Sequence, residues 1–171
     1  LQELTLQNVL GNVLGIIKGF CAPEREQAYA RAYELCQQVK ETPQLFPVLW
    51  GLWVFYFVRG EVQTGCELGE QLLHLAQSME DPALLIEAHV ALGAVLLRRG
   101  ELASARGHLE QGIGLYDLRR HRSHAFLYGQ DPKVTCLSDV AYALWLLGYP
   151  DQARKRNQEA LTLAQELAHP F

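Results

Sequence analysis

The sequence predicts an all-α protein, built as a right-handed α–α superhelix (a solenoid) of about four helical hairpins. Leucine and alanine make up 48 of the 171 residues, whereas valine, isoleucine and threonine make up 20. Leucine and alanine favour helix and the β-branched residues favour strand, so this composition indicates helices. Glycines also end successive apolar segments, and a small residue follows each of these glycines at the same distance.

The hairpins are expected at about residues 1–40, 44–79, 82–116 and 132–168 of a single domain, which we expect to be a fragment of a longer protein. Their helices are expected at about 2–18, 23–40, 44–59, 61–79, 82–99, 101–116, 132–147 and 150–168. A single hairpin of this kind cannot bury its apolar face alone. Stacking of neighbouring hairpins buries it, and a small rotation per hairpin produces a superhelix with a concave face.

The first hairpin is the least regular of the four. Its first helix is apolar over most of its length, and Pro23 lies near the expected start of the second helix. Prolines are tolerated there because the first helical position needs no backbone N–H. Ala28 and Ala32 give this second helix a small-residue face, as expected for a helix that packs closely.

In the other hairpins, glycine marks the turn between the two helices. Gly60, Gly100 and Gly148 follow apolar helical segments, and Gly65, Ala105 and Ala153 come five residues after them. Glycine readily adopts the left-handed conformation that ends a helix, so each of the three is expected to close its first helix.

Two Asp-Pro pairs mark helix starts. Asp81-Pro82 and Asp131-Pro132 each place a side-chain acceptor before a proline at the first helical position. Between the third and fourth hairpins, residues 117–130 are expected to form an irregular connection. Its length exceeds that of ordinary helix–helix connections, and such loops are usually functional or disordered.

Charge and cysteine content limit the function classes. Fifteen basic and nineteen acidic side chains give a net charge of -4, which provides no general attraction to nucleic acid or anionic lipid. No apolar run is long enough to cross a bilayer, and the start of the chain lacks the pattern of a signal peptide. The four cysteines form no metal-binding spacing and are expected to be buried and free, as in a reducing, cytoplasmic compartment.

Motifs of catalysis are missing from the sequence. It contains no phosphate-binding G-x-x-x-x-G-K-[ST], no G-x-S-x-G and no H-E-x-x-H. Asp117, His121, His124 and Asp131 are metal-ligand types, but neighbouring arginines would oppose a cation. We therefore expect no catalysis, no metal and no cofactor in this chain.

Residues 88–105 resemble the tetratricopeptide repeat. The resemblance rests on Leu92-Gly93, Gly100-Glu101 and Ala105, and residues 52–61 repeat part of it. Residues 46–53, 121–126 and 144–153 look like the C-terminal helical repeats of large bacterial signalling ATPases, many of which carry class III nucleotide cyclase domains. The resemblance covers nearly the whole chain. It implies a regulatory helical region, with the ATPase and cyclase domains upstream.

The concave face is expected to be aromatic and apolar, since the first helix of each hairpin lines it. The residues predicted to form a partner-binding groove are Trp50, Val54, Phe57, Leu97, Arg98, Tyr142 and Trp145. Two interpretations stay open, because these aromatic side chains suit both packing between hairpins and docking of a peptide.

The connection at 117–130 also has two interpretations. It is either a structural insertion with solvated arginines, or a loop that binds an acidic partner segment or a phosphate. The residues predicted to bind in the second case are Arg119, Arg120, Arg122 and His124.

The sequence thus predicts a non-catalytic protein-interaction or sensory module of a bacterial signalling protein. Its expected partner is a peptide segment or a neighbouring domain of the same polypeptide, and self-association through uncapped ends is also expected. The alternative is a small-molecule sensor in which the Arg/His loop holds an anionic ligand.

Overall fold

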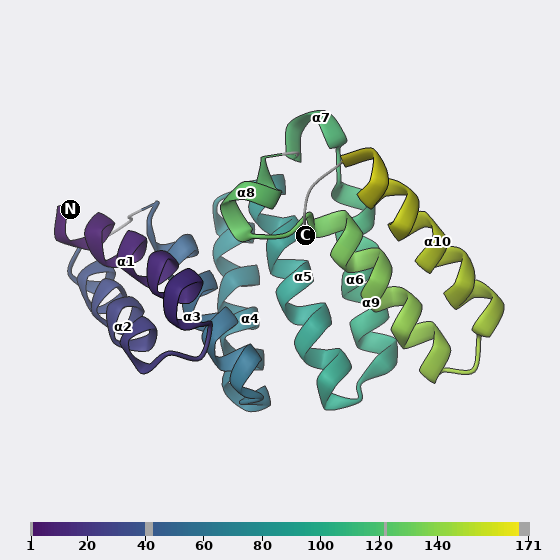
Figure 1. The fold of residues 1–171 in the computed structure, drawn as a ribbon, viewed down its shortest axis with the longest axis horizontal. Helices are drawn as coiled ribbons and strands as arrows, with labels where there is room; N and C mark the ends of the chain where they lie inside the picture. The colour runs from purple at the N-terminus through teal and green to yellow at the C-terminus, as the bar shows by residue number, and fades with distance from the viewer. Residues whose placement is uncertain (1, 40–42, 122, 168–171) are drawn as a thin grey trace. The chain divides into compact units, whose positions relative to one another are not determined.

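A computed structural model describes residues 2–39, 43–121 and 123–167, and every regular element in these ranges is a helix (Figure 1). The helices are α1 (Gln2–Lys18), α2 (Pro23–Gln38), α3 (Leu45–Arg59), α4 (Val62–Ser78), α5 (Pro82–Arg99), α6 (Leu102–Leu115), α7 (Leu118–His121), α8 (His124–Tyr128), α9 (Pro132–Leu146) and α10 (Pro150–Leu167). The predicted all-α helical-repeat fold is therefore confirmed.

The chain divides into two compact units, Leu1–Leu75 and Ala76–Phe171. We call them unit 1 and unit 2 and describe each by itself. Unit 1 holds α1 to α3 and most of α4, and unit 2 holds α5 to α10.

Unit 1 is organised around the ring of Tyr29. α1 packs on α2 and α3, and α2 packs on α3. A Cβ atom on Gly11 of α1 would lie 2.6 Å from the Tyr29 ring, and one on Gly51 of α3 would lie 2.2 Å from it. The buried ring thus fills a slot between two glycines, while its hydroxyl donates to Oδ1 of Asn12 at 2.9 Å.

Unit 2 shows the packing expected of a hairpin repeat. α5 packs on α6, α6 on α9, and α9 on α10, while the two first helices α5 and α9 also touch. Gly93 of α5 allows Leu109 of α6 to approach, since a Cβ there would lie 2.4 Å from the leucine side chain. Gly112 of α6 does the same for Cys136 of α9, at 2.9 Å.

The helix ends follow the sequence pattern. Gly60, Gly100 and Gly148 adopt φ of 79°, 85° and 85°, the left-handed conformation predicted for all three. Asp81 accepts a hydrogen bond from the backbone N–H of Ala83 at 2.8 Å. Asp131 accepts from two backbone N–H groups at the start of α9, each at 3.0 Å. Both Asp-Pro pairs therefore cap helices as expected.

Two expectations need correction. Residues 117–130 are not an irregular loop, because α7 and α8 form within them. Cys21 is exposed in the turn between α1 and α2, whereas Cys36, Cys66 and Cys136 are buried; all four are free.

Among the described helices, none is both long and apolar enough to span a membrane.

Candidate functional site

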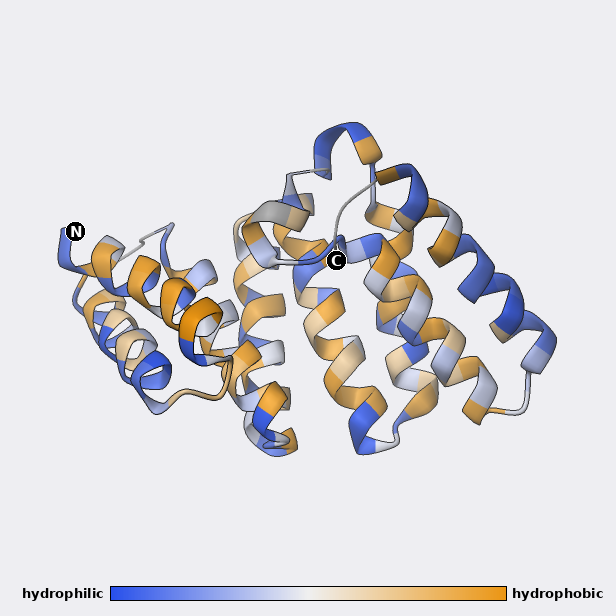
Figure 2. Ribbon diagram, in the orientation of Figure 1, coloured by the Kyte–Doolittle hydropathy of each residue, from blue (hydrophilic) through white to orange (hydrophobic). Residues whose placement is uncertain are grey.

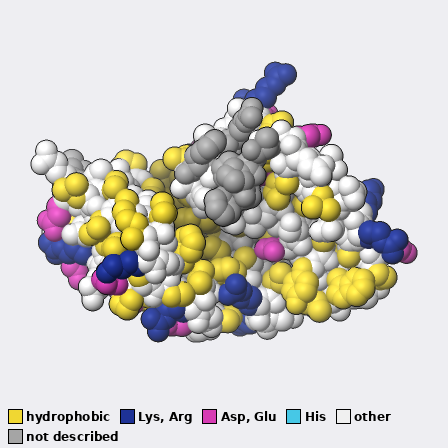
Figure 3. Space-filling view, viewed as in Figure 1, with side chains coloured by type: hydrophobic (Ala, Val, Ile, Leu, Met, Phe, Trp, Pro, Cys, Tyr) yellow, Lys and Arg dark blue, Asp and Glu magenta, His cyan; other side chains and the backbone are white. Residues whose placement is uncertain are grey.

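An exposed aromatic surface lies on α9 and the turn that follows it. Tyr142 is 56% exposed and Trp145 63%, and Leu146 and Tyr149 are each about half exposed. We call these four residues the α9 aromatic surface. Figure 3 shows hydrophobic side chains gathered over the C-terminal end of α9. Large aromatic side chains are costly to leave in water, and they are enriched at binding hot spots.

The helical spacing explains why these side chains face outward. Residues buried against α5, α6 and α10 occupy the other side of α9, as Cys136, Val140 and Leu144 illustrate. Tyr142 and Trp145 are three residues apart and so lie on one face of the helix. The α9 pattern therefore sets three of the four residues of this surface, and Tyr149 follows the helix in the turn.

Two residues of opposite charge lie on α9 and on the adjacent helix α5. Asp139 lies one helical turn before Tyr142, and Arg98 lies in the last turn of the adjacent helix α5. Burial raises the pKa of Asp139 to about 6, while the charge of Arg98 opposes that rise. Leu97 beside Arg98 is half-buried. Four of the predicted groove residues, Leu97, Arg98, Tyr142 and Trp145, thus belong to the two first helices of unit 2, which pack on each other.

The other three predicted groove residues belong to unit 1. Trp50 is only 6% exposed, and its ring centroid lies 5.1 Å from that of Trp53. Trp53 stacks in turn on Phe57 at 4.7 Å. Val54 and Phe57 are half-buried. For Trp50 the geometry is that of packing within unit 1, which is the first of the two interpretations left open by the sequence.

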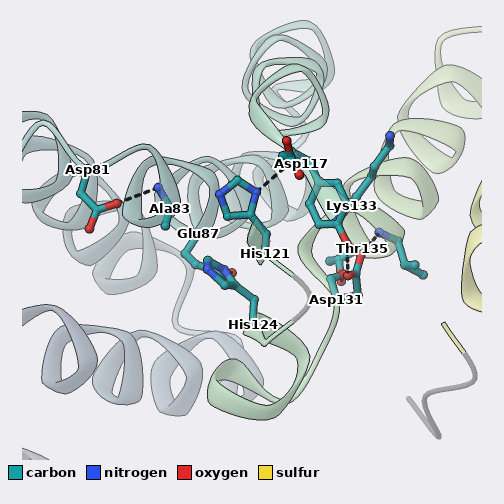
Figure 4. A network of polar contacts seen from close by, with 11 residues as sticks. Asp81, Ala83, Glu87, Asp117, His121, His124, Asp131, Lys133 and Thr135 are labelled. Atoms are coloured by element: carbon teal, nitrogen blue, oxygen red, sulfur yellow. Dashed lines mark hydrogen bonds and ion pairs between the residues drawn. The ribbon is translucent and has the colours of Figure 1, made fainter. Parts of the chain in front are cut away.

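A buried polar cluster lies between α5 and the short helices α7 and α8 (Figure 4). Glu87 of α5 is fully buried, and its Oε1 lies 2.6 Å from Nδ1 of His124 on α8. Burial raises the pKa of Glu87 to about 7, against the opposing effect of the His124 hydrogen bond. The edge of the His124 ring meets His121, with centroids 5.2 Å apart.

Further hydrogen bonds fix both ends of the 117–130 segment. Nδ1 of His121 accepts from the backbone N–H of Asp117 at 2.9 Å. The hydroxyl of Tyr116 donates to Oδ2 of Asp131 at 2.7 Å, so the capping residue of α9 also holds the end of α6. The cluster therefore ties the segment to three long helices, which is a structural role.

Three of the four residues predicted to bind an anion are described by the structure, and one of these three, His124, is buried away from the other two. Arg119 and Arg120 are exposed on α7, and Arg122 lies outside the described residues. His124 is 5% exposed and bonded to Glu87. The prediction that His124 acts beside the arginines is corrected, because the buried carboxyl group of Glu87 needs a polar partner and draws the imidazole inward.

Sequence reasoning missed Asp139, Leu146, Tyr149 and Glu87. Asp139 and Leu146 lie three residues before and four residues after Tyr142, so counting along α9 would have found them. Tyr149 lies beyond the end of α9, where helical spacing does not apply. Glu87 is a lone charge inside the apolar run of α5, which is itself a signal of a buried polar partner.

A histidine pair between α5 and α6 was also missed. Nδ1 of His89 lies 3.1 Å from Nδ1 of His108, and burial lowers the pKa of both, that of His89 to about 4. At this distance the N–H of one neutral ring can donate a hydrogen bond to the ring nitrogen of the other, and this hydrogen bond accounts for the contact. In the described part of the chain, no group of three or more His, Cys, Asp or Glu residues is placed to hold a metal ion.

No family model matches the chain. The chain is similar to an uncharacterized protein of Rhizobium meliloti (strain 1021), with 21% identity over 170 residues. The match covers 98% of this chain and 16% of that protein, so the chain spans about a sixth of its relative. The resemblance to tetratricopeptide repeats and to signalling ATPases stays a prediction.

Proposed function

We propose that this chain is a non-catalytic interaction module, and that it binds a peptide segment or a neighbouring protein domain through the α9 aromatic surface. It would work in the cytoplasm as part of a bacterial signalling protein. Partner binding there would bias a neighbouring domain, as expected where two sites are coupled through a rigid repeat.

The exposure of Trp145 is the observation that carries this proposal. At 63% it is exposed, whereas the other two tryptophans of the chain, Trp50 and Trp53, are buried at 6% and 3%. Trp145 and Tyr142 together offer a broad apolar contact with few rotatable bonds, which is favourable for binding. Arg98 of α5 and Asp139 of α9 supply polar contacts of both signs, which suits a peptide better than a uniformly charged ligand.

The small-molecule alternative has less support in the geometry. It requires the Arg/His loop to hold an anion, and the imidazole of His124 faces Glu87 in the interior of unit 2 instead. The α9 aromatic surface lies on the open face of a helix, and an exposed face suits an extended or helical segment better than a small ligand that must be enclosed.

A display library of random linear peptides, selected on the purified chain, tests the proposed function. We expect Trp145→Ala and Tyr142→Ala to weaken the selected peptides by about tenfold or more, as hot-spot residues do. Leu127→Ala is the matched control, because Leu127 is a comparably exposed side chain (67%) on α8. Bound peptide should also protect Trp145 fluorescence from acrylamide quenching.

The result that would contradict the proposal is equally clear. If the library yields no peptide, or only peptides whose affinity is the same for wild type and for Trp145→Ala, the α9 aromatic surface is not the binding site.

A further inference from the structure

The outer face of α1 is apolar and exposed. Seven large hydrophobic residues on α1 and just after it are between 41% and 83% exposed: Leu6, Val9, Leu10, Val13, Ile16, Ile17 and Phe20. We call them the α1 face. Figure 2 shows the contrast between α1, which is rich in hydrophobic residues, and the hydrophilic α10.

The packing of unit 1 does not use this face. α1 meets α2 and α3 through its opposite side, where Leu4, Gly11 and Gly15 are buried. The two charged residues of α1 lie near its ends and already have partners in unit 1: Glu3 accepts from Arg31 at 2.9 Å, and Lys18 pairs with Glu24. The middle of the α1 face therefore carries no charge.

The spacing along the α1 face shows what kind of surface fits it. Leu6, Leu10, Val13 and Ile17 are separated by four, three and four residues. Alternating steps of three and four are the pattern by which one helix packs along another at a shallow angle. The order four, three, four is the same read from either end.

We infer that the α1 face pairs with the α1 face of a second copy of this chain, in an antiparallel arrangement about a two-fold axis. In this arrangement Leu6 of each copy meets Ile17 of the other, and Leu10 meets Val13. This spacing lets the two helices pair in either direction, and the charges at the ends of α1 select one of them. Antiparallel pairing brings the acidic end of one α1, at Glu3, toward the basic end of the other, at Lys18, whereas parallel pairing would bring like charges together.

The size of the α1 face is sufficient for such a dimer. Seven side chains exposed to this extent present on the order of 600 Å² of apolar surface, which is at the upper end for a monomer that leaves it in water. Burying it in both copies removes about 1,200 Å² in total, the lower bound for a specific interface. We therefore expect a dimer that forms reversibly at micromolar concentration.

Sedimentation equilibrium of the purified chain from about 1 to 100 µM tests the inference, because a micromolar equilibrium is resolved in that range. The expected mass rises from 19.3 kDa toward twice that value. Leu10→Glu and Ile16→Glu should each keep the chain at the monomer mass. Both positions are exposed, at 46% and 83%, so circular dichroism should show an intact fold. Leu127→Glu, on α8, should leave the dimer unchanged.

Pulsed electron spin resonance with a spin label at residue 2, on a Cys21→Ser background, tests the direction of pairing. Antiparallel helices hold the two labels about 28 Å apart at 1.5 Å per residue, whereas parallel helices hold them about 10 Å apart. A monomer mass at every concentration would overturn the inference. So would a dimer that survives both glutamate substitutions, or labels that lie side by side.

Discussion

At the scale of single residues, Glu87 shows how a buried acid can be tolerated. It is fully buried, and only one of its oxygens has a partner, since Oε2 has none among the described residues. Burial shifts the balance of this carboxyl group toward its protonated form and raises its pKa to about 7, because ionisation would place a charge in an apolar interior. His124 compensates part of this cost through its hydrogen bond, and so attaches α8 to α5.

Replacing Glu87 with glutamine should change how stability depends on pH. The folded-state pKa of about 7 lies above the ordinary value of 4.5, so the folded chain binds this proton more tightly than the unfolded chain. Its contribution to stability is complete below pH 4.5 and is lost as the pH rises through 7. Glu87→Gln removes this titration, so the decline in thermal midpoint between these pH values should become smaller. Glu70→Gln, at an exposed position of α4, is the control. Parallel pH profiles for wild type and Glu87→Gln would contradict the argument.

At the scale of helices, two glycines of one hairpin should respond in opposite ways to substitution. Gly100 has φ of 85°, so Gly100→Val should cost roughly 1 kcal/mol or more through backbone strain. Gly107 lies within α6, and a Cβ there would meet no atom within 4 Å. Gly107→Ala should therefore stabilise by up to about 1 kcal/mol. Thermal unfolding measures both changes, and effects of the same sign would mean that the hairpin register is wrong.

The same helices show what the sequence was able to predict. The start of α5 was predicted because Asp81 and Pro82 act within one turn, and its end because Gly100 closes it locally. α7 and α8 were not predicted, because a contact between residues distant in the sequence holds them in place. The hydrogen bond between Glu87 and His124 joins residues that are 37 positions apart. The sequence pattern alone also could not predict that Trp50 is buried and Trp145 exposed. Both follow apolar helical spacing, and only the neighbouring helices decide that one is buried and the other exposed.

At the scale of the whole molecule, the helices of unit 2 pack against one another and form a core within the unit. Its four long helices pack in sequence, and the Glu87 cluster adds α7 and α8 to them. Asp81 begins α5 with a cap that needs only the backbone of Ala83. Between α4 and α5 the chain turns at Glu80, which has φ of 50°. A cut just before Asp81 thus falls in a turn near the start of unit 2 and leaves α5 to α10 whole.

We expect the fragment of residues 81–171 to fold without the rest of the chain. Its core comes from α5, α6 and α9, where Leu109, Val140 and Leu144 are all at most 1% exposed. A domain of this size with its own core generally unfolds in one cooperative step. Far-ultraviolet circular dichroism should show a helical spectrum and a single thermal transition. The same fragment carrying Gly93→Val should lose stability strongly, because its side chain would collide with Leu109. A random-coil spectrum for the unsubstituted fragment would show that α5 to α10 require residues 1–80 in order to fold.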